Sequence, residues 1–170
     1  ARAMFQGRRV QRHERSLFLS AARSQIFNAV LAERVEKGNW NRPIDGEVWM
    51  LEGTHSIFGP EPLTPELNAR LERGDVAPTG PMWGAGELRT REAVADLESS
   101  VAARYPELAA GLASAGLRQE RRSLVLRPRE LELRSLPDSG IELSFYLSSG
   151  AYATVLLREI FDYQSGFQGF

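Results

Sequence analysis

The segment SSGAYATVLLRE, residues 148–159, combines residue types that could hold a planar ligand. It follows a strand-like run, 141–147, and continues into a helix-like run. Gly150 permits a tight turn or the close approach of another backbone. Tyr152 stands where the helix is expected to begin, at the end that offers free amide donors and the positive pole of the helix dipole. A ring at such a corner either caps a core or presents its face to a bound molecule.

Arg158 lies further along the same helix-like run, among Leu156, Leu157 and Ile160. A cation with so many apolar neighbours is expected to be paired with a carboxylate. Glu159 is adjacent in sequence but points elsewhere on a helix. From these residues alone, a core tyrosine and a structural salt bridge are the favoured interpretation of the segment.

A second candidate is the arginine-rich stretch LRQERRSLVLRPRELELR. Its cations are Arg118, Arg121, Arg122, Arg127, Arg129 and Arg134. In strands every second residue shares a face, so Arg127 and Arg129 are expected to point together. Phosphate contact competes here with an ordinary solvated face, and the solvated face is the favoured alternative.

Other chemistry finds little support. The chain has no cysteine, which excludes disulfides and thiolate sites, and its two histidines lack metal-ligand spacing. The glycine-rich stretch GPMWGAGE lacks both the dinucleotide fingerprint and the lysine of a phosphate loop, so a structural loop over Trp83 is favoured. No serine sits in a nucleophile elbow. Acidic residues such as Glu66, Glu72 and Glu98 are expected on solvated helix surfaces.

The 170 residues suffice for one domain, or for one domain and part of another, and 42% hydrophobic content is typical of a globular protein. No apolar run is long enough to span a membrane, and a cytoplasmic location is expected. Charge is uneven: residues 1–42 carry nine cations and three anions, residues 43–116 carry five and twelve, and residues 117–170 carry seven of each. All cations except Lys37 are arginine. This bias is compatible with RNA binding, and it is equally compatible with a GC-rich coding sequence.

Periodicity predicts a mixed, helix-rich first part. Residues 16–38 show one apolar stripe ending at Gly38, and residues 45–59 read as two short strands around a turn at 52–53. Residues 64–74 predict a helix with Thr64 as cap and Gly74 as stop. Residues 74–89 are expected to be loop, because prolines and glycines break any period. Thr90 is a possible cap for one or two helices broken near Pro106.

From residue 119 the pattern changes to alternating runs separated by turn residues, followed by a helix at about 151–161. This predicts a series of antiparallel strands. Three strands and one helix bury little apolar surface alone. The tail is therefore expected to complete a sheet that begins elsewhere.

Four pieces together resemble one family: SLFLSAARSQIFNAVLAERV, GELRTREAVADLE, AGLRQERRSLVLRP and LSSGAYATVLLREI. In order and over nearly the whole chain, they are similar to the TruD family of tRNA pseudouridine synthases. The patterns LSAARSxxFNxxxAER and GxYATxxLRE are the specific ones. The resemblance implies an α+β protein: a helix-rich α/β insertion domain, followed by antiparallel strands and a helix that complete a pseudouridine-synthase-type sheet.

By this resemblance, residues 1–122 correspond to the insertion domain and residues 123–170 to the C-terminal part of the catalytic domain. The family's catalytic aspartate lies in an upstream motif that no aspartate of this chain matches. The chain is thus expected to be the C-terminal portion of an enzyme, inactive by itself, with the rest of its own catalytic domain as a partner.

The resemblance also implies a mechanism that needs no cofactor and no metal, with tRNA as partner and uridine-13 of the D-arm as the family substrate. A flipped uracil would stack on Tyr152 beside Gly150, and Arg158 would pair with the catalytic aspartate. Relatives often have phenylalanine at the position of Tyr152. The alternative is a non-catalytic RNA-binding module that uses arginine-rich surfaces, with Arg121, Arg122, Arg127 and Arg129 as weak candidates for RNA contact.

Overall fold

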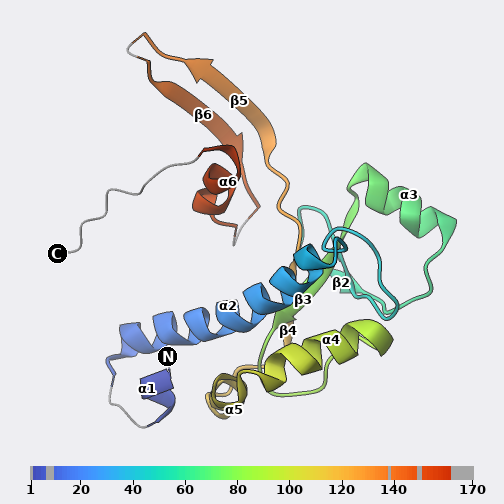
Figure 1. The fold of residues 1–170 in the computed structure, drawn as a ribbon, viewed down its shortest axis with the longest axis vertical. Helices are drawn as coiled ribbons and strands as arrows, with labels where there is room; N and C mark the ends of the chain where they lie inside the picture. Colours follow the sequence, from blue (N-terminus) through green and yellow to red (C-terminus); the bar gives the residue numbers. More distant parts are fainter. Residues whose placement is uncertain (1, 7–9, 138, 149–150, 162–170) are drawn as a thin grey trace. The chain divides into compact units, whose positions relative to one another are not determined.

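The computed structural model describes residues 2–6, 10–137, 139–148 and 151–161, and the chain forms two compact units, 1–125 and 126–170 (Figure 1). The first unit contains α1 (Arg2–Phe5), α2 (Arg12–Glu36), β1 (Trp49–Leu51), β2 (Ile57–Phe58), α3 (Pro65–Arg73), β3 (Val76–Met82), α4 (Glu92–Ala103), α5 (Pro106–Ser114) and β4 (Glu120–Ser123). The second contains β5 (Arg129–Ser135), β6 (Ile141–Tyr146) and α6 (Ala153–Ile160). The predicted α+β class is confirmed.

The sheet of the first unit has the order β2-β1-β3-β4, and each neighbouring pair is antiparallel. In β1 and the residue before it, Val48, Trp49 and Met50 are all buried, so both faces of this strand are covered. Strands β1 and β2 pair with each other, so the predicted pair of short strands around the turn at 52–53 is confirmed.

Strand β3 corrects the prediction that residues 74–89 are loop throughout. It lies between β1 and β4, with Pro78 opposite Trp49 and Pro81 opposite Arg121. A proline removes only a donor, and the Pro78 carbonyl still accepts a hydrogen bond from the Leu124 amide (2.9 Å). The prolines obscure the strand in sequence because they are rare in central strands, yet the register accommodates both.

Gly80, in the same strand, leaves room for neighbouring side chains. A Cβ at this position would lie 2.8 Å from Phe27 of α2 and 2.8 Å from the Leu124 side chain. The missing side chain lets α2 approach the sheet closely. Gly80 thus interrupts the alternation of residue types expected of a strand, and it also allows α2 to pack against β3.

The helix predictions hold for α2, α3, α4 and α5, including the break before Pro106. Thr64 caps α3, with its hydroxyl accepting from the Leu67 amide at 3.1 Å, and Gly74 ends that helix in the left-handed conformation. Thr90 is not a cap: Arg91 is the residue before α4, and the Thr90 hydroxyl donates instead to buried Glu98 (2.9 Å).

The core of the first unit joins α2 to the hairpin of α4 and α5. It is formed by Ala22, Ile26, Ala102, Leu108 and Leu112. Trp83, after β3, packs against this cluster, as expected for a structural loop. Arg23 of α2 holds that loop, because its guanidinium donates to the carbonyls of Trp83 (3.0 Å) and Met82 (2.9 Å).

The second unit is a β5–β6 hairpin with α6 following it (Figure 1). The prediction of one series of three strands is wrong in its pairing. Strand β4 pairs with β3 in the first unit, whereas β5 and β6 pair with each other. The division between the two compact units falls at 125/126, after β4, which belongs to the first sheet.

Candidate functional site

Tyr152 lies immediately before α6, with an extended backbone, and its side chain is 62% exposed. The residue occupies the N-cap position but makes no side-chain capping bond. Its ring is therefore not a core residue of this chain, which corrects the interpretation favoured from the residues alone. Gly150, the other residue named for this corner, lies outside the residues that the structure describes.

Arg158 lies in the last turn of α6 and is exposed. Among the residues that the structure describes, no carboxylate is within ion-pair distance of its guanidinium. The expectation that Arg158 is a buried cation is thus wrong, and the described part of the chain supplies no partner for the expected salt bridge. A cation at this end of a helix interacts favourably with the helix dipole, which is a sufficient local reason for the position.

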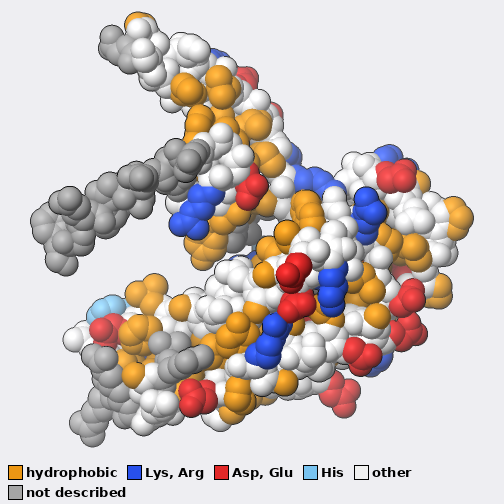
Figure 2. All heavy atoms as spheres, viewed as in Figure 1, with side chains coloured by type: hydrophobic (Ala, Val, Ile, Leu, Met, Phe, Trp, Pro, Cys, Tyr) orange, Lys and Arg blue, Asp and Glu red, His pale blue; other side chains and the backbone are white. Residues whose placement is uncertain are grey.

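The second unit exposes an unusual amount of apolar surface. Figure 2 shows hydrophobic side chains gathered along the β5–β6 hairpin, and α6 has no buried residue. The exposed large apolar residues are Leu131, Leu133, Leu136, Ile141, Tyr146, Tyr152, Val155 and Ile160. A two-stranded hairpin with such faces is marginal alone, and contiguous exposed apolar surface marks a region that binds another surface.

The four arginines considered for RNA contact are placed differently from one another. Arg129 is exposed at the first position of β5, opposite Tyr146, whereas Arg127 precedes the strand and is half-buried. The two do not share one strand, so the expected alternation does not apply to them. Arg122 of β4 is half-buried, and its guanidinium lies over the Phe27 ring at 5.6 Å from the centroid.

Arg121 belongs to a buried polar network rather than to a surface. Its side chain is 4% exposed and that of Glu98 is 0% exposed, and the two form a bidentate pair at 2.7 and 2.9 Å. Arg121 also donates to the hydroxyl (3.0 Å) and carbonyl (2.8 Å) of Thr79. This placement does not agree with RNA contact by Arg121, because its guanidinium donates to Thr79 and Glu98 in the protein interior. It also corrects the expectation that Glu98 is solvated.

A second buried pair joins α2 to the segment before β1. Arg34 donates to Glu47 at 2.6 Å and to the carbonyls of Asn39 (2.9 Å) and Arg42 (2.8 Å). Desolvation raises the pKa of the Glu47 carboxyl from 4.5 to about 7, although the nearby guanidinium of Arg34 acts in the opposite direction. Burial is the larger effect here, so this carboxyl titrates near neutral pH.

Sequence reasoning missed both pairs, although a signal was present. Glu98 lies on the buried stripe of α4, four residues after Val94 and three before Val101. Arg34 lies four residues after Val30 on the buried stripe of α2. A charged residue on an apolar stripe indicates a buried pair, but only the fold identifies its partner.

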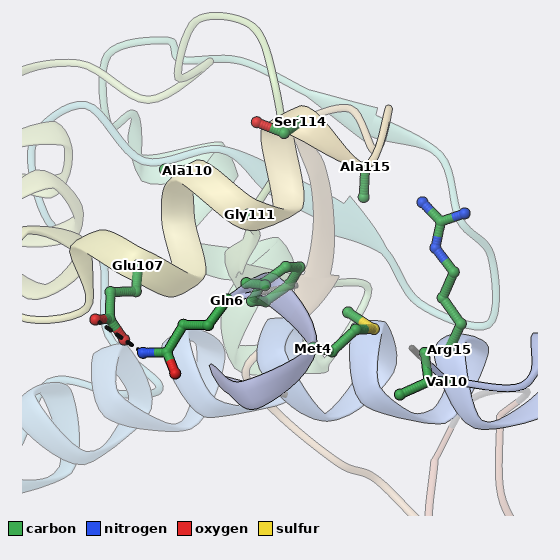
Figure 3. A pocket seen from close by; sticks show the side chains of 10 residues that line it. Met4, Gln6, Val10, Arg15, Glu107, Ala110, Gly111, Ser114 and Ala115 are labelled. Atoms are coloured by element: carbon green, nitrogen blue, oxygen red, sulfur yellow. Dashed lines mark hydrogen bonds between the residues drawn. The ribbon is translucent and has the colours of Figure 1, made fainter. Parts of the chain in front are cut away.

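An open cavity of about 580 Å³ lies between α1, the start of α2 and α5 (Figure 3). The ring of Phe5 sits where a Cβ on Gly111 would be, so the glycine makes room for α1 against α5. Gln6 donates to Glu107 at 3.5 Å at one edge. Small and apolar side chains form most of the lining, which is typical of helix packing rather than of catalysis.

No group of three or more histidine, aspartate or glutamate residues in the described part of the chain could hold a metal ion. None of the helices there has the length and apolar character that crossing a membrane would require.

The fold therefore combines a helix-covered antiparallel sheet with a separate hairpin and helix, and the four family-like segments of the sequence lie in both units. The profile of the family "tRNA pseudouridine synthase D (TruD)" matches residues 6–160. The chain belongs to the TruD family.

Relatives support this assignment. A tRNA pseudouridine synthase D of Xanthomonas campestris pv. campestris (strain 8004) is 50% identical over 155 residues, which are 90% of this chain and 42% of that protein. One from Aeromonas hydrophila is 46% identical over 171 residues, which are 100% of this chain and 48% of that protein. The chain thus spans a little under half the length of these curated relatives.

A solved structure shares the fold. The Methanosarcina mazei protein assigned to tRNA pseudouridine synthase D is similar with a TM-score of 0.56 and 24% sequence identity. The match covers 81% of this chain and 36% of the other. At this identity the likeness concerns the fold.

Proposed function

We propose that the protein containing this chain is an isomerase that converts uridine to pseudouridine in tRNA, at uridine-13 of the D-arm, in the cytoplasm. Membership of the TruD family and the names of the relatives support the reaction. The observation that carries the proposal for this chain is the exposed ring of Tyr152 at the beginning of α6, within the family's matched segment.

The reaction breaks the glycosidic C–N bond of uridine and forms a C–C bond between the same sugar and the same base. The base must leave the RNA stack and be held while it is turned, which stacking on an aromatic ring achieves. Tyr152 supplies that ring, with Gly150 allowing the RNA or a neighbouring backbone to approach. An aspartate acts as nucleophile or base at the sugar, and it comes from sequence outside this chain.

Residues 123–170 are proposed to complete the sheet of the catalytic domain, and residues 1–122 to form the inserted domain. The exposed apolar side chains of β5, β6 and α6 support this, because a hairpin with such faces requires a covering surface. Arg158 would then face the catalytic aspartate, keeping that carboxylate ionised and oriented.

The stacking role is tested by pseudouridine formation on tRNA in the longer protein that includes this chain. Tyr152→Ala is expected to lower activity by roughly 5- to 150-fold, the equivalent of about 1–3 kcal/mol for one stacked base. Tyr152→Phe keeps the ring and is the matched control, expected to remain active. Equal turnover of Tyr152→Ala and wild type contradicts stacking.

The role of Arg158 has a separate readout in the pH dependence of the rate. Removing a guanidinium beside an aspartate raises the pKa of that carboxyl, so Arg158→Ala should move the acid limb of the pH–rate profile to higher pH. Arg158→Lys should restore part of the wild-type profile. An unshifted acid limb in Arg158→Ala refutes the pairing.

The alternative of a non-catalytic RNA-binding module has less support, since Arg121 is buried in the pair with Glu98. It predicts that this 170-residue chain binds tRNA by itself with affinity that falls steeply as salt rises. We expect the chain alone to form no pseudouridine. Tight, salt-dependent binding in a protein whose complete form is inactive would favour the alternative.

A further inference from the structure

The outward side of α2, in the first unit, is a surface that the proposed function leaves unexplained. The helix buries five residues on its inner side: Ala22, Ile26, Phe27, Val30 and Arg34. On the opposite side, residues recur every three or four positions, the spacing that brings side chains to one side of a helix. This outer face consists of Leu17, Ala21, Ser24, Asn28, Leu31 and Val35. Four of the six are exposed, among them Leu17 (67%) and Val35 (54%).

The outer face carries no charged side chain, which is unusual for a helix surface in contact with water. Residues 16–32 contain one charged residue, Arg23, where the chain average of 25% would give about four. Arg23 does not lie on this face, because its side chain is 11% exposed and its guanidinium donates to backbone carbonyls at the end of β3. By contrast, α3 exposes Glu66, Glu72 and Arg73 within nine residues. The outer face of α2 is therefore not typical of a solvated helix.

The chemistry of the outer face suits a protein surface rather than RNA, because binding to a phosphate backbone depends on lysine and arginine. Leu17, Leu31 and Val35 make its two ends apolar. Ser24 and Asn28 provide a hydroxyl and a carboxamide between them. Interfaces between domains of one chain have this mixed character, whereas the interfaces of obligate dimers are more apolar. The composition therefore favours another domain of the same protein.

The size of the outer face favours the same partner. From Leu17 to Val35 the helix rises about 27 Å, and a strip about 10 Å wide has an area of roughly 300 Å². A stable complex of separate molecules buries about 800 Å² on each partner. Two segments of one chain need less, because the chain that links them keeps their effective concentration high. This chain matches 42% and 48% of the two relatives, so more than half of each relative lies outside the match.

We propose that the outer face of α2 is the interface between the first unit and the part of the longer protein that this chain does not contain. Apolar side chains of that part cover Leu17, Leu31 and Val35, and its polar groups bond to Ser24 and Asn28. The inference rests on the proposed function in one respect only, that this chain belongs to a longer protein. It does not depend on the reaction or on the role of Tyr152.

The test is the rate at which a thiol on the outer face reacts with a maleimide. This chain has no cysteine, so Asn28→Cys introduces one thiol, and Ser99→Cys, on the exposed side of α4, is the matched control. Each variant is made in the 170-residue chain and in the longer protein, and peptide mapping by mass spectrometry assigns the label to its site. We expect Asn28→Cys to react at least about tenfold more slowly in the longer protein than in the chain alone. Ser99→Cys should react equally in both.

A charge placed on the outer face is the second measurement, and it also separates protein from RNA. Asn28→Lys should lower the thermal unfolding midpoint of the longer protein by about 3 °C or more, because a covered ammonium loses its hydration. In the 170-residue chain the same substitution is exposed and should change the midpoint by less than about 1 °C. Ser99→Lys is the matched control and should be neutral in both proteins. Circular dichroism verifies that each variant is folded.

Three outcomes overturn the proposal. The first is equal labelling of Asn28→Cys in the chain and in the longer protein, or an unchanged midpoint of the longer protein with Asn28→Lys, which would mean that the face is open. The second is slow labelling in the 170-residue chain alone, which assigns a second copy if it depends on protein concentration. The third is labelling that slows only after tRNA is added, with tighter tRNA binding by Asn28→Lys, which assigns RNA. None of these readouts uses pseudouridine formation, so failure here is distinct from failure of the proposed reaction.

Discussion

Removing the carboxylate of Glu98 is expected to destabilise the first unit by about 3–5 kcal/mol, the usual cost of leaving a buried charge without its partner. Glu98 accepts two bonds from Arg121, at 2.9 and 2.7 Å, and one from Thr90, at 2.9 Å. Both members of the ion pair are shielded from water, with exposures of 0% and 4%. Water therefore cannot replace the missing carboxylate unless the structure opens.

The assay is urea unfolding of the 170-residue chain, followed by circular dichroism. With a typical m-value of about 1–3 kcal/mol/M, Glu98→Leu should lower the unfolding midpoint by more than about 1 M. Glu98→Gln retains an acceptor and should lie between wild type and Glu98→Leu, which keeps the test usable if the leucine variant does not fold. Glu132→Ala is the matched control, because its pair with Arg134 is exposed and should contribute about 0–1 kcal/mol.

The double variant Glu98→Leu with Arg121→Met separates the two parts of this reasoning. It removes both charges, so it should be more stable than Glu98→Leu alone, with a coupling free energy of at least about 1 kcal/mol. Thr79 keeps a partner in this variant, since its hydroxyl donates to the Val48 carbonyl at 2.6 Å. A cost below about 1 kcal/mol for Glu98→Leu, or a double variant less stable than that single one, would refute the argument.

Three further outcomes are expected in the same unfolding assay. The pKa of Glu47 is raised from 4.5 to about 7 on folding, so the folded state retains a proton that the unfolded state loses. The stability from this group is present below about pH 4.5 and lost as pH rises to about 7, on the order of 3 kcal/mol; Glu47→Gln should remove that slope, and an unchanged slope would contradict it. Gly80→Ala places a Cβ 2.8 Å from Phe27 and should cost about 1–3 kcal/mol by overpacking, whereas an unchanged midpoint would show that α2 moves freely. Thr64→Ala removes the cap of α3 and should cost about 1 kcal/mol, while Thr64→Asn should be nearly neutral.

Local chemistry is where the sequence was most informative. The apolar stripe of α2, the threonine cap and glycine stop of α3, and the break at Pro106 are all properties of neighbouring residues, and all appear as expected. Strand β3 was missed because its prolines and Gly80 are not typical of strands. Gly80 is needed there for the packing of α2 on the sheet, which depends on tertiary structure and leaves no local pattern in the sequence.

The candidate site divides in the same way. Motifs in the sequence were enough to indicate the family and to single out Tyr152 and Arg158, because the spacing of a motif can be read directly from the order of residues. Whether a side chain is covered depends on segments distant in sequence, so only the tertiary structure showed that both residues are exposed. The same reason applies to Arg121, which a strand pattern could place on a surface but which the fold buries against Glu98, 23 residues away.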